Sequence, residues 1–313
     1  MTKKKTDSKA KKQEKLTDAA KDSKSKSDKP KADKGKAKSE KPKAEKTKEK
    51  KAKKSEEVVF EEIETVDDLE AAVTRGVTFE ETDFSGSDLA DARLAGIVLR
   101  DSNLAGVDLS GADLTGADLS GAVLAGAMLA GAKLNGALLV GADLAGATLA
   151  GASAIEADFM GAQLAGVDAA EADFQRANFY EASLAGADLS EANLDGAVLV
   201  QSDLSGAALY KASLKKVQLE DADLSGADLS AARLDGSLMM GADFSGVGAE
   251  KANFSKTTAS EADFSGAALD RAKFDKADLS GSDFSGVSAT GASFKDAEMK
   301  DVDPESLDGA KGL

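Results

Sequence analysis

Residues 112–121 read ADLTGADLSG, the same five-residue pattern twice in succession. A large apolar residue stands at the third position of each unit, as Leu114 and Leu119, and Ala stands two positions before it. A spacing of five fits neither the 3.6-residue period of an α-helix nor the two-residue period of a strand. The spacing predicts a chain that turns a corner every five residues and points the same two side chains inward each time.

The pattern continues in both directions without an insertion or deletion. Every position ending in 4 or 9 from Phe79 to Met299 is apolar, and these 45 positions hold 27 Leu, 11 Phe, 5 Ala and 2 Met. Two residues earlier, 31 of the 45 positions are Ala. Self-similarity at a fixed period indicates a repeat architecture. We therefore assign residues 77–302 to one continuous repeat domain.

The units resemble the A(D/N)LXX motif of the pentapeptide-repeat family, most clearly at residues 112–116 (ADLTG) and 187–191 (ADLSE). The resemblance covers residues 77–302, about 70% of the chain. It implies an all-β fold, a right-handed quadrilateral β-helix with four repeats per coil. The 45 repeats then make about 11 coils. At the ~4.8 Å spacing of neighbouring strands, the rod would be about 54 Å long.

Interior volume provides a check on this register, because a void of several methylene groups is destabilising. Five central positions are reduced to Ala, and four of them have an enlarged residue two positions earlier, namely Val167, Val247, Thr257 and Val287. Ala154 has no such compensation. From residue 244 to residue 294, Phe stands at every tenth position. This alternation predicts two opposite walls with large interior residues and smaller residues on the walls between them.

A cap is predicted at residues 58–76, directly before the repeat. Residues 58–60 (VVF) are expected to form a short strand. Apolar residues recur at helical spacing in residues 66–75, and Thr65 with Asp68 resembles a capping box. We therefore predict a short helix at 66–75 that covers the open end of the β-helix. Residues 303–313 form a C-terminal end segment.

The net charge of −16 combines two regions of opposite sign. Residues 1–57 hold 23 Lys against 11 Asp and Glu, a net charge of +12, with almost no large apolar residue. Such a segment cannot offset the entropy of ordering, so we predict a disordered basic tail. The tail would be attracted to nucleic acid without sequence specificity, or it would be a solubilising extension without a specific partner. Residues 58–313 carry 17 Lys and Arg against 45 Asp and Glu.

Several classes of function are disfavoured by composition. The chain has no Cys and no His, which excludes disulfides, the usual zinc sites and Ser-His catalysis. Residues 213–216 (SLKK) match the S-x-x-K spacing, but Leu214 falls in the inward register and the companion motifs are missing. We predict no enzymatic activity, no cofactor and no metal site. The chain has no apolar run of 18 residues, so we expect a cytoplasmic protein without a membrane span.

With four repeats per coil, outward residues twenty positions apart share a wall. One wall then carries an apolar set, which is our candidate interface: Leu138, Val140, Met160, Tyr180, Val198, Val200, Leu238 and Met240. A contiguous exposed apolar patch is typical of a docking or dimerisation surface. The alternative is that these residue types simply favour β-structure.

A second set is acidic and forms a candidate ladder: Asp203, Asp223, Asp243, Asp263 and Asp283. One interpretation is structural, because short polar side chains hydrogen-bond to nearby backbone at turns. The other is functional. Residues 77–302 hold 15 Lys and Arg against 36 Asp and Glu, a net charge of −21, which is roughly two-thirds of the charge density of duplex DNA.

We expect a non-enzymatic scaffold that binds a protein partner of unknown identity through an outer wall, or a second copy of itself as a homodimer. The first alternative is an acidic DNA mimic that binds a topoisomerase or another DNA-binding protein. Pentapeptide-repeat proteins of the quinolone-resistance type resemble B-DNA and engage DNA gyrase, although this chain has no loop interrupting the repeat. The second alternative is an adaptor tethered to nucleic acid by residues 1–57.

Overall fold

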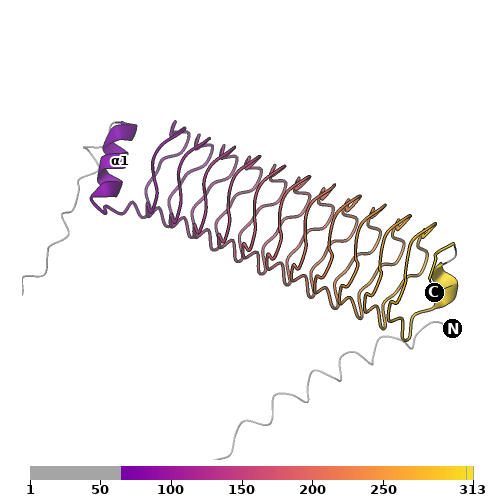
Figure 1. Cartoon of the computed structure of the whole chain (residues 1–313). Coiled ribbons are helices and arrows are strands. Elements are labelled where there is room, and N and C mark those ends of the chain that lie inside the picture. Colours follow the sequence, from indigo (N-terminus) through magenta and orange to yellow (C-terminus); the bar gives the residue numbers. More distant parts are fainter. Residues whose placement is uncertain (1–64, 308, 313) are drawn as a thin grey trace, which may run out of the picture. The chain divides into compact units, whose positions relative to one another are not determined.

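The computed structural model describes residues 65–307 and 309–312. In this part of the chain, stacked coils form a rod (Figure 1). Helix α1 (Val66–Thr74) precedes the first coil and the 3₁₀ helix η2 (Pro304–Leu307) follows the last. The predicted tail, 1–57, and the predicted strand at 58–60 lie outside the described residues.

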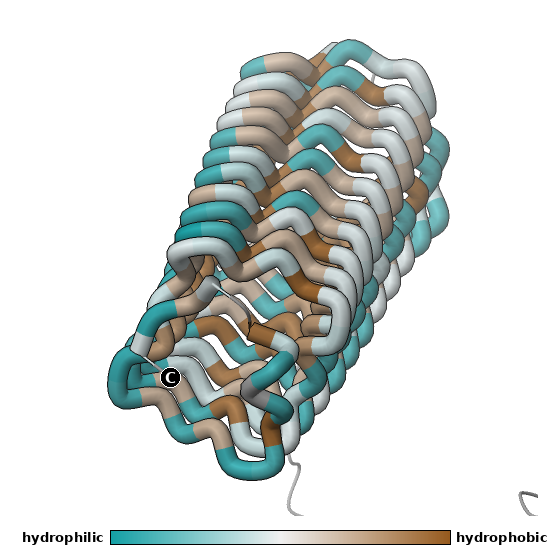
Figure 2. Tube along the Cα trace, turned by 90° about the vertical axis from the view of Figure 1, so that its right-hand side faces the viewer, coloured by the Kyte–Doolittle hydropathy of each residue, from teal (hydrophilic) through white to brown (hydrophobic). Residues whose placement is uncertain are grey.

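The coils are held together by parallel bridges between single residues, and the bridges from Thr78 to Glu298 join positions twenty residues apart. One further bridge joins Ser293 of the last coil to Lys311 in the end segment. Thr78 pairs with Val98, for example, and Val98 pairs with Asp118. Twenty residues are four pentapeptides, so each coil has four sides, as predicted. Figure 2 shows the coils stacked in register along the rod.

The bridges define four walls, which we number in chain order. Each wall comprises a bridged residue, the inward residue that follows it and the next outward residue. A corner residue and a second inward residue, most often Ala, then lead to the next wall. The bridged columns run from Thr78 to Glu298 in wall 1, from Asp83 to Asp283 in wall 2, from Asp88 to Ser288 in wall 3 and from Arg93 to Ser293 in wall 4. Walls 1 and 3 are opposite, as are walls 2 and 4.

The chain turns at each corner through a tight turn. At one such corner, the amide of Ala117 donates to the carbonyl of Leu114 at 2.9 Å, and Gly116 between them has a φ of 65°. A hydrogen bond between residues three apart, with positive φ only at the third residue, is the signature of a type II turn. The corner residue therefore lies in the backbone region that favours glycine.

The inward positions form one continuous dry core. Leu114, Leu119 and Leu124 are fully buried, as the five-residue period predicts. The predicted Phe alternation is also confirmed, because the aromatic rings form two columns on opposite walls. Rings in wall 2 stack at 4.9 and 5.0 Å (Phe244, Phe264, Phe284), and rings in wall 4 stack at 4.7 and 4.9 Å (Phe254, Phe274, Phe294). Rings of the two columns meet edge-on.

Ala154 also has a physical explanation in the structure. It is fully buried although no enlarged residue precedes it. Phe159 follows it in the same coil, and Phe174 lies one coil further along the same wall as Ala154. The rings of Phe159 and Phe174 meet edge-on at 5.9 Å, and Phe159 also stacks on Phe179 at 4.8 Å. Large inward rings thus stand on the next wall and in the next coil beside Ala154, in place of an enlarged residue two positions before it.

Both ends of the rod are covered. Helix α1 has the predicted capping box, in which Thr65 Oγ1 accepts the amide of Asp68 at 3.2 Å and Asp68 Oδ2 accepts the amide of Thr65 at 3.1 Å. Helix α1 buries Leu69 against the core. At the other end, η2 buries Leu307. The chain then returns to the last coil, where the carbonyl of Lys311 accepts the amide of Phe294 at 2.8 Å.

Glu70 of α1 supplies a hydrogen-bond acceptor that a preceding coil would otherwise supply to the first coil. Within the rod, the amide of Asp113 donates to the carbonyl of Ala92 in the preceding coil. The equivalent amide of Arg93 has no preceding coil and donates instead to Glu70 Oε1 at 2.8 Å, while the guanidinium of Arg93 contacts Glu70 Oε2 at 2.7 Å. Hydrogen bonds from the side chain and backbone of Arg93 lower the pKa of Glu70 below its usual value of 4.5.

The replacement of Glu70 by Ala should expose the first coil to exchange. Hydrogen–deuterium exchange of the Arg93 amide should accelerate several-fold in Glu70→Ala, whereas Glu80→Ala should leave it unchanged, because the carboxylate of Glu80 only approaches Arg100 at 3.8 Å. The pKa of Glu70 is depressed in the folded state, so its stabilisation is complete above pH 4.5 and is lost as the pH falls through the folded-state pKa. Equal protection of Arg93 in both variants would contradict this role.

Candidate interaction surfaces

Wall 1 brings all eight residues of the predicted apolar set together. Leu138, Val198 and Leu238 belong to its bridged column, and the other five stand two residues later in the same wall. The side chains of Leu138, Met160, Leu238 and Met240 are exposed by 40 to 49%. Val140, Tyr180, Val198 and Val200 are half-buried. The structure therefore places the whole set on one wall, on five of the six coils from Leu138 to Met240.

Glu220 interrupts this apolar surface. It stands in the outer column of wall 1, one coil after Val200 and one coil before Met240. Its Oε2 atom is buried and accepts no hydrogen bond within the described part of the chain. A buried oxygen without a donor is costly, so the surface of wall 1 contains one polar group whose hydrogen-bonding capacity is not satisfied by its own neighbours.

The predicted acidic ladder lies in the bridged column of wall 2, on five consecutive coils. In each residue of the ladder, Oδ1 accepts the amide of the Ser two residues later, at distances from 2.7 to 2.9 Å. The carboxylates are therefore part of the turns. The outer column of wall 2, two residues after the bridged column, holds only Ala or Ser, and its corners are Gly, from Ser85 and Gly86 to Ser285 and Gly286. The bridged column holds no Lys or Arg. Wall 2 thus carries no cation beside the ladder.

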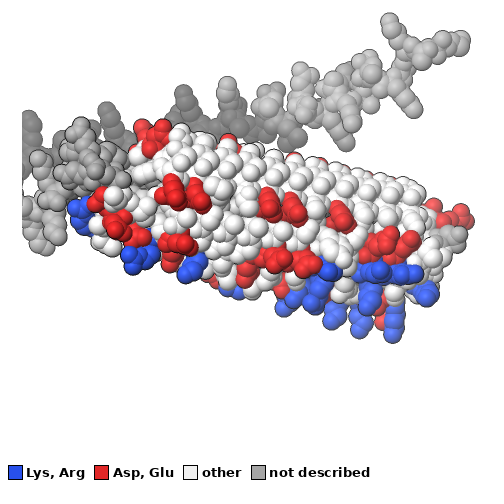
Figure 3. Space-filling view, turned by 90° about the horizontal axis from the view of Figure 1, so that it is seen from above, with Lys and Arg blue, Asp and Glu red and all other residues white. Residues whose placement is uncertain are grey.

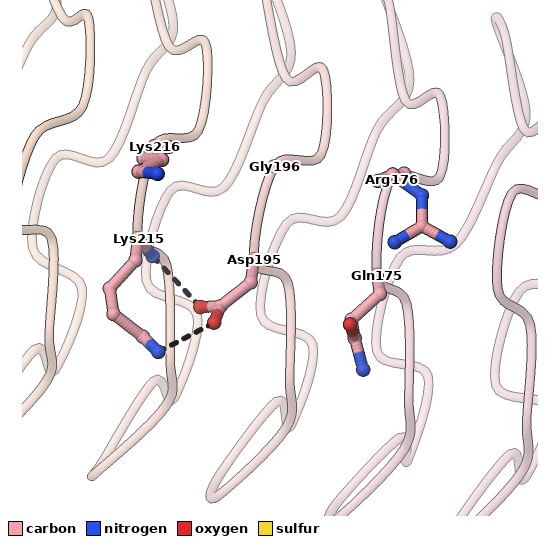
Figure 4. Close-up of a pocket in the computed structure, with 6 residues that line it drawn as sticks. All are labelled: Gln175, Arg176, Asp195, Gly196, Lys215 and Lys216. Carbon is pink, nitrogen blue, oxygen red and sulfur yellow. Dashed lines mark hydrogen bonds and ion pairs between the residues drawn. The ribbon is translucent and has the colours of Figure 1, made fainter.

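Wall 4 carries a hollow of about 510 Å³, lined by Gln175, Arg176, Asp195, Gly196, Lys215 and Lys216 (Figure 4). Gly196 stands between Arg176 and Lys216 in the corner column, and its missing side chain opens the hollow.

Asp195 in this hollow is fully engaged by its neighbours. It accepts Lys215 Nζ at 2.7 Å, the Lys215 amide at 3.0 Å and Ser213 Oγ at 2.6 Å. Burial would raise the pKa of Asp195, but the hydrogen bonds from Lys215 and Ser213 outweigh it and hold that pKa below its usual value. Leu214 is buried, as its inward register predicts. The hydroxyl of Ser213 donates to Asp195, and no hydrogen bond joins it to Lys216, the lysine of the S-x-x-K spacing, in the described part of the chain. The spacing therefore does not form a nucleophile and base.

Metal ligation and membrane crossing find no support in the described residues. No group of three or more His, Cys, Asp or Glu side chains in residues 65–307 and 309–312 is arranged to hold a metal ion. Within the same ranges, no helix has the length and apolar character needed to cross a bilayer.

Comparison with known proteins identifies the repeat. A family model described as "Pentapeptide repeats (8 copies)" matches overlapping segments that together run from residue 68 to residue 303. A search of curated proteins gave no match.

Similar solved structures include HetL from the cyanobacterium Nostoc, a pentapeptide repeat protein involved in the regulation of heterocyst differentiation. HetL is 31% identical, the match covers 78% of this chain and 97% of HetL, and the TM-score is 0.30. QnrB1, a plasmid-mediated fluoroquinolone resistance protein, is 20% identical over 73% of this chain and 91% of QnrB1, with a TM-score of 0.27. A pentapeptide repeat protein of the Arabidopsis thaliana thylakoid lumen is 27% identical over 34% of this chain and 71% of its own, with a TM-score of 0.22.

The turn hydrogen bonds of the ladder predict different effects for two substitutions of Asp243. Asn retains an oxygen that can accept the amide of Ser245, so Asp243→Asn should leave the thermal midpoint unchanged. Asp243→Ala removes the acceptor, which is worth about 1 kcal/mol, and should lower the midpoint by about 2–4 °C. Calorimetry of both variants tests this. An equal loss in Asp243→Asn would show that charge, not the turn, is what stabilises the protein there.

Proposed function

We propose that this chain, which belongs to the pentapeptide-repeat family, is a non-enzymatic scaffold that binds a protein partner through wall 1. The observation that carries the proposal is the position of the exposed apolar side chains. Of the seven large hydrophobic residues exposed among the described residues, four lie on wall 1 (Leu138, Met160, Leu238, Met240). The other three are divided between walls 2 and 3 (Val123, Met128, Tyr210).

The interior does not require these residues on wall 1. The inward positions already fill the core, and the equivalent outward column of wall 3 is mostly Ala and Ser in the same coils, as at Ala130, Ala150 and Ala170. A preference for β-structure would act on all four walls alike, because they share one backbone conformation. The concentration on one wall is therefore better explained by contact with a partner.

The apolar surface extends over about five coil steps, or roughly 24 Å along the rod. An elongated apolar strip of this length suits a partner that presents an extended apolar face. Glu220 adds a polar requirement, because its half-buried carboxylate interrupts the apolar surface and a partner must accommodate its charge at that position. Aliphatic contacts would supply affinity, and Glu220 would fix the position of the partner along the apolar surface of wall 1.

The apolar strip is tested by Val140→Asp combined with Met160→Asp. When the full-length chain is used to capture partners in the source cell, the variant should fail to retain a partner that the wild type retains. If the partner is a second copy, sedimentation should show a lower mass for the variant than for the wild type. The matched control is Ala130→Asp with Ala150→Asp, which adds the same charge to wall 3 and should keep the partner. Retention by both variants, or loss by both, would contradict a role for wall 1.

A second candidate function is that of an acidic DNA mimic. The alignment of five carboxylates on consecutive coils of wall 2, with no cation beside them, favours it. In this function the rod would occupy the DNA-binding surface of a topoisomerase or a similar protein.

The test of mimicry is gyrase supercoiling in the presence of micromolar full-length protein. Inhibition by the wild type should weaken when Asp203, Asp223 and Asp243 are replaced together by Asn, a change that keeps the turn hydrogen bonds and removes three charges. Supercoiling that is indifferent to the wild-type protein would exclude the mimic.

A further inference from the structure

The cations of the C-terminal half are confined to one side of the rod. Between residues 204 and 299, every Lys and Arg lies in wall 4 or at one of its two corners. We call this set the basic strip: Lys211, Lys215, Lys216, Arg233, Lys251, Lys256, Arg271, Lys273, Lys276 and Lys295. Figure 3 shows Lys and Arg gathered along one edge of the rod toward its C-terminal end. The strip occupies five consecutive coils.

Most of these cations have no acidic partner. The five segments of chain that form the strip contain these ten cations and three acidic residues, Asp235, Asp275 and Asp296. The strip therefore has a net charge of +7 in a repeat region whose overall charge is negative. Ion pairs within 4.0 Å engage Lys211, Lys215 and Arg233. The other seven strip cations have no carboxylate within that distance in the described part of the chain. The strip therefore concentrates positive charge that is available to bind an anionic partner.

Many of these cations have a backbone conformation that disfavours side chains, as do acidic residues at other corners such as Glu156, Glu181 and Glu261. Six of the strip cations stand at corners, with φ from 56° to 62° (Lys211, Lys216, Lys251, Lys256, Arg271, Lys276). Gly adopts this conformation without steric penalty, whereas a side chain there is strained. Wall 2 uses Gly at every corner from Gly86 to Gly286. At the strip, charged residues are retained at positions where Gly would relieve the strain.

We propose that the basic strip binds the phosphodiester backbone of nucleic acid. The five coils extend the strip over roughly 20 Å, along which duplex DNA carries about 12 phosphates. Cations that recur on consecutive coils match a linear polyanion of constant charge density. The strip is a contact separate from wall 1 and from the tail of residues 1–57, whose net charge of +12 has the same sign.

Two other partners fit the strip less well. A bilayer surface would favour apolar side chains among the cations, and none of the exposed large hydrophobic residues lies on wall 4. A second copy could offer the acidic N-terminal half of wall 4, but three of its acids, Glu156, Glu191 and Asp195, already form ion pairs within their own chain.

The test compares the full-length chain with a triple variant, Lys256→Gly, Arg271→Gly and Lys276→Gly, in binding a labelled random-sequence duplex DNA at several salt concentrations. A plot of log K against log salt has a negative slope, and each lost phosphate contact reduces its magnitude by about 0.9. The triple variant should therefore reduce the magnitude of the slope by about 2 to 3. The thermal midpoint should not decrease, because Gly relieves positive φ. Lys273→Gln with Lys295→Gln, at unstrained positions, should lower the slope by about 2.

The control Ser245→Asp, Ser265→Asp and Ser285→Asp changes the net charge by the same amount on wall 2, and it should keep the slope near that of the wild type. The tail is identical in all variants, so differences report the strip. An unchanged slope in the Gly variant, or an equal fall in the wall 2 control, would overturn the proposal. So would binding to phosphatidylserine vesicles without binding to DNA, or a wild-type dimer that the Gly variant dissolves while its DNA slope is unchanged.

Discussion

The structure depends on one constraint: residues twenty positions apart must lie directly over one another. Each coil satisfies its backbone hydrogen bonds through its neighbours, as when the amide of Leu119 donates to the carbonyl of Leu138 at 2.7 Å. The inward side chains then stack at the same spacing, which the Phe rings show at 4.7 to 5.0 Å. An insertion of one residue would turn inward side chains outward for the rest of the rod. This explains why the period persists without interruption from Phe79 to Met299.

The outward side chains are not subject to this constraint, so the four walls can differ in their surface residues. Wall 1 carries most of the exposed large apolar side chains, between Leu138 and Met240. Wall 2 carries the Asp ladder beside small residues, and wall 4 becomes basic after Lys211. The rod is thus a rigid frame that presents surfaces of different chemistry at right angles. The overall charge conceals this division, since it averages an acidic wall with a basic one.

The sequence predicted most features that the fixed period determines. The inward columns, the two Phe walls and the capping box of Thr65 and Asp68 are all confirmed, because each depends on local spacing. The large rings beside Ala154 were not predicted as compensation, since Phe159 stands on the next wall and Phe174 stands one coil further along the same wall. The pairing of Glu70 with Arg93 and the return of the chain after Leu307 were also missed, because the repeat register does not extend beyond the last coil at either end.

The basic strip could have been found from the sequence. Its ten cations all fall within the same six consecutive positions of the twenty-residue coil, but along the chain they are interleaved with acids that belong to other walls. The strip becomes visible only when the cations are assigned to walls in the same way as the apolar and acidic residues. The Asp ladder shows the opposite situation, since the sequence located it and offered turn hydrogen bonds as one interpretation, and the structure confirms those hydrogen bonds.

Pulsed electron spin resonance between paired spin labels tests the twenty-residue stacking most directly. The chain has no Cys, so label sites are introduced freely in the outward column of wall 2, at Ala105 paired in turn with Ala145, Ala165 or Ala185. The stacking predicts that the distance between labels grows by about 4.8 Å for every twenty residues. A different increment, or distances that do not grow linearly with sequence separation, would contradict the four-sided coil and the wall assignments that depend on it.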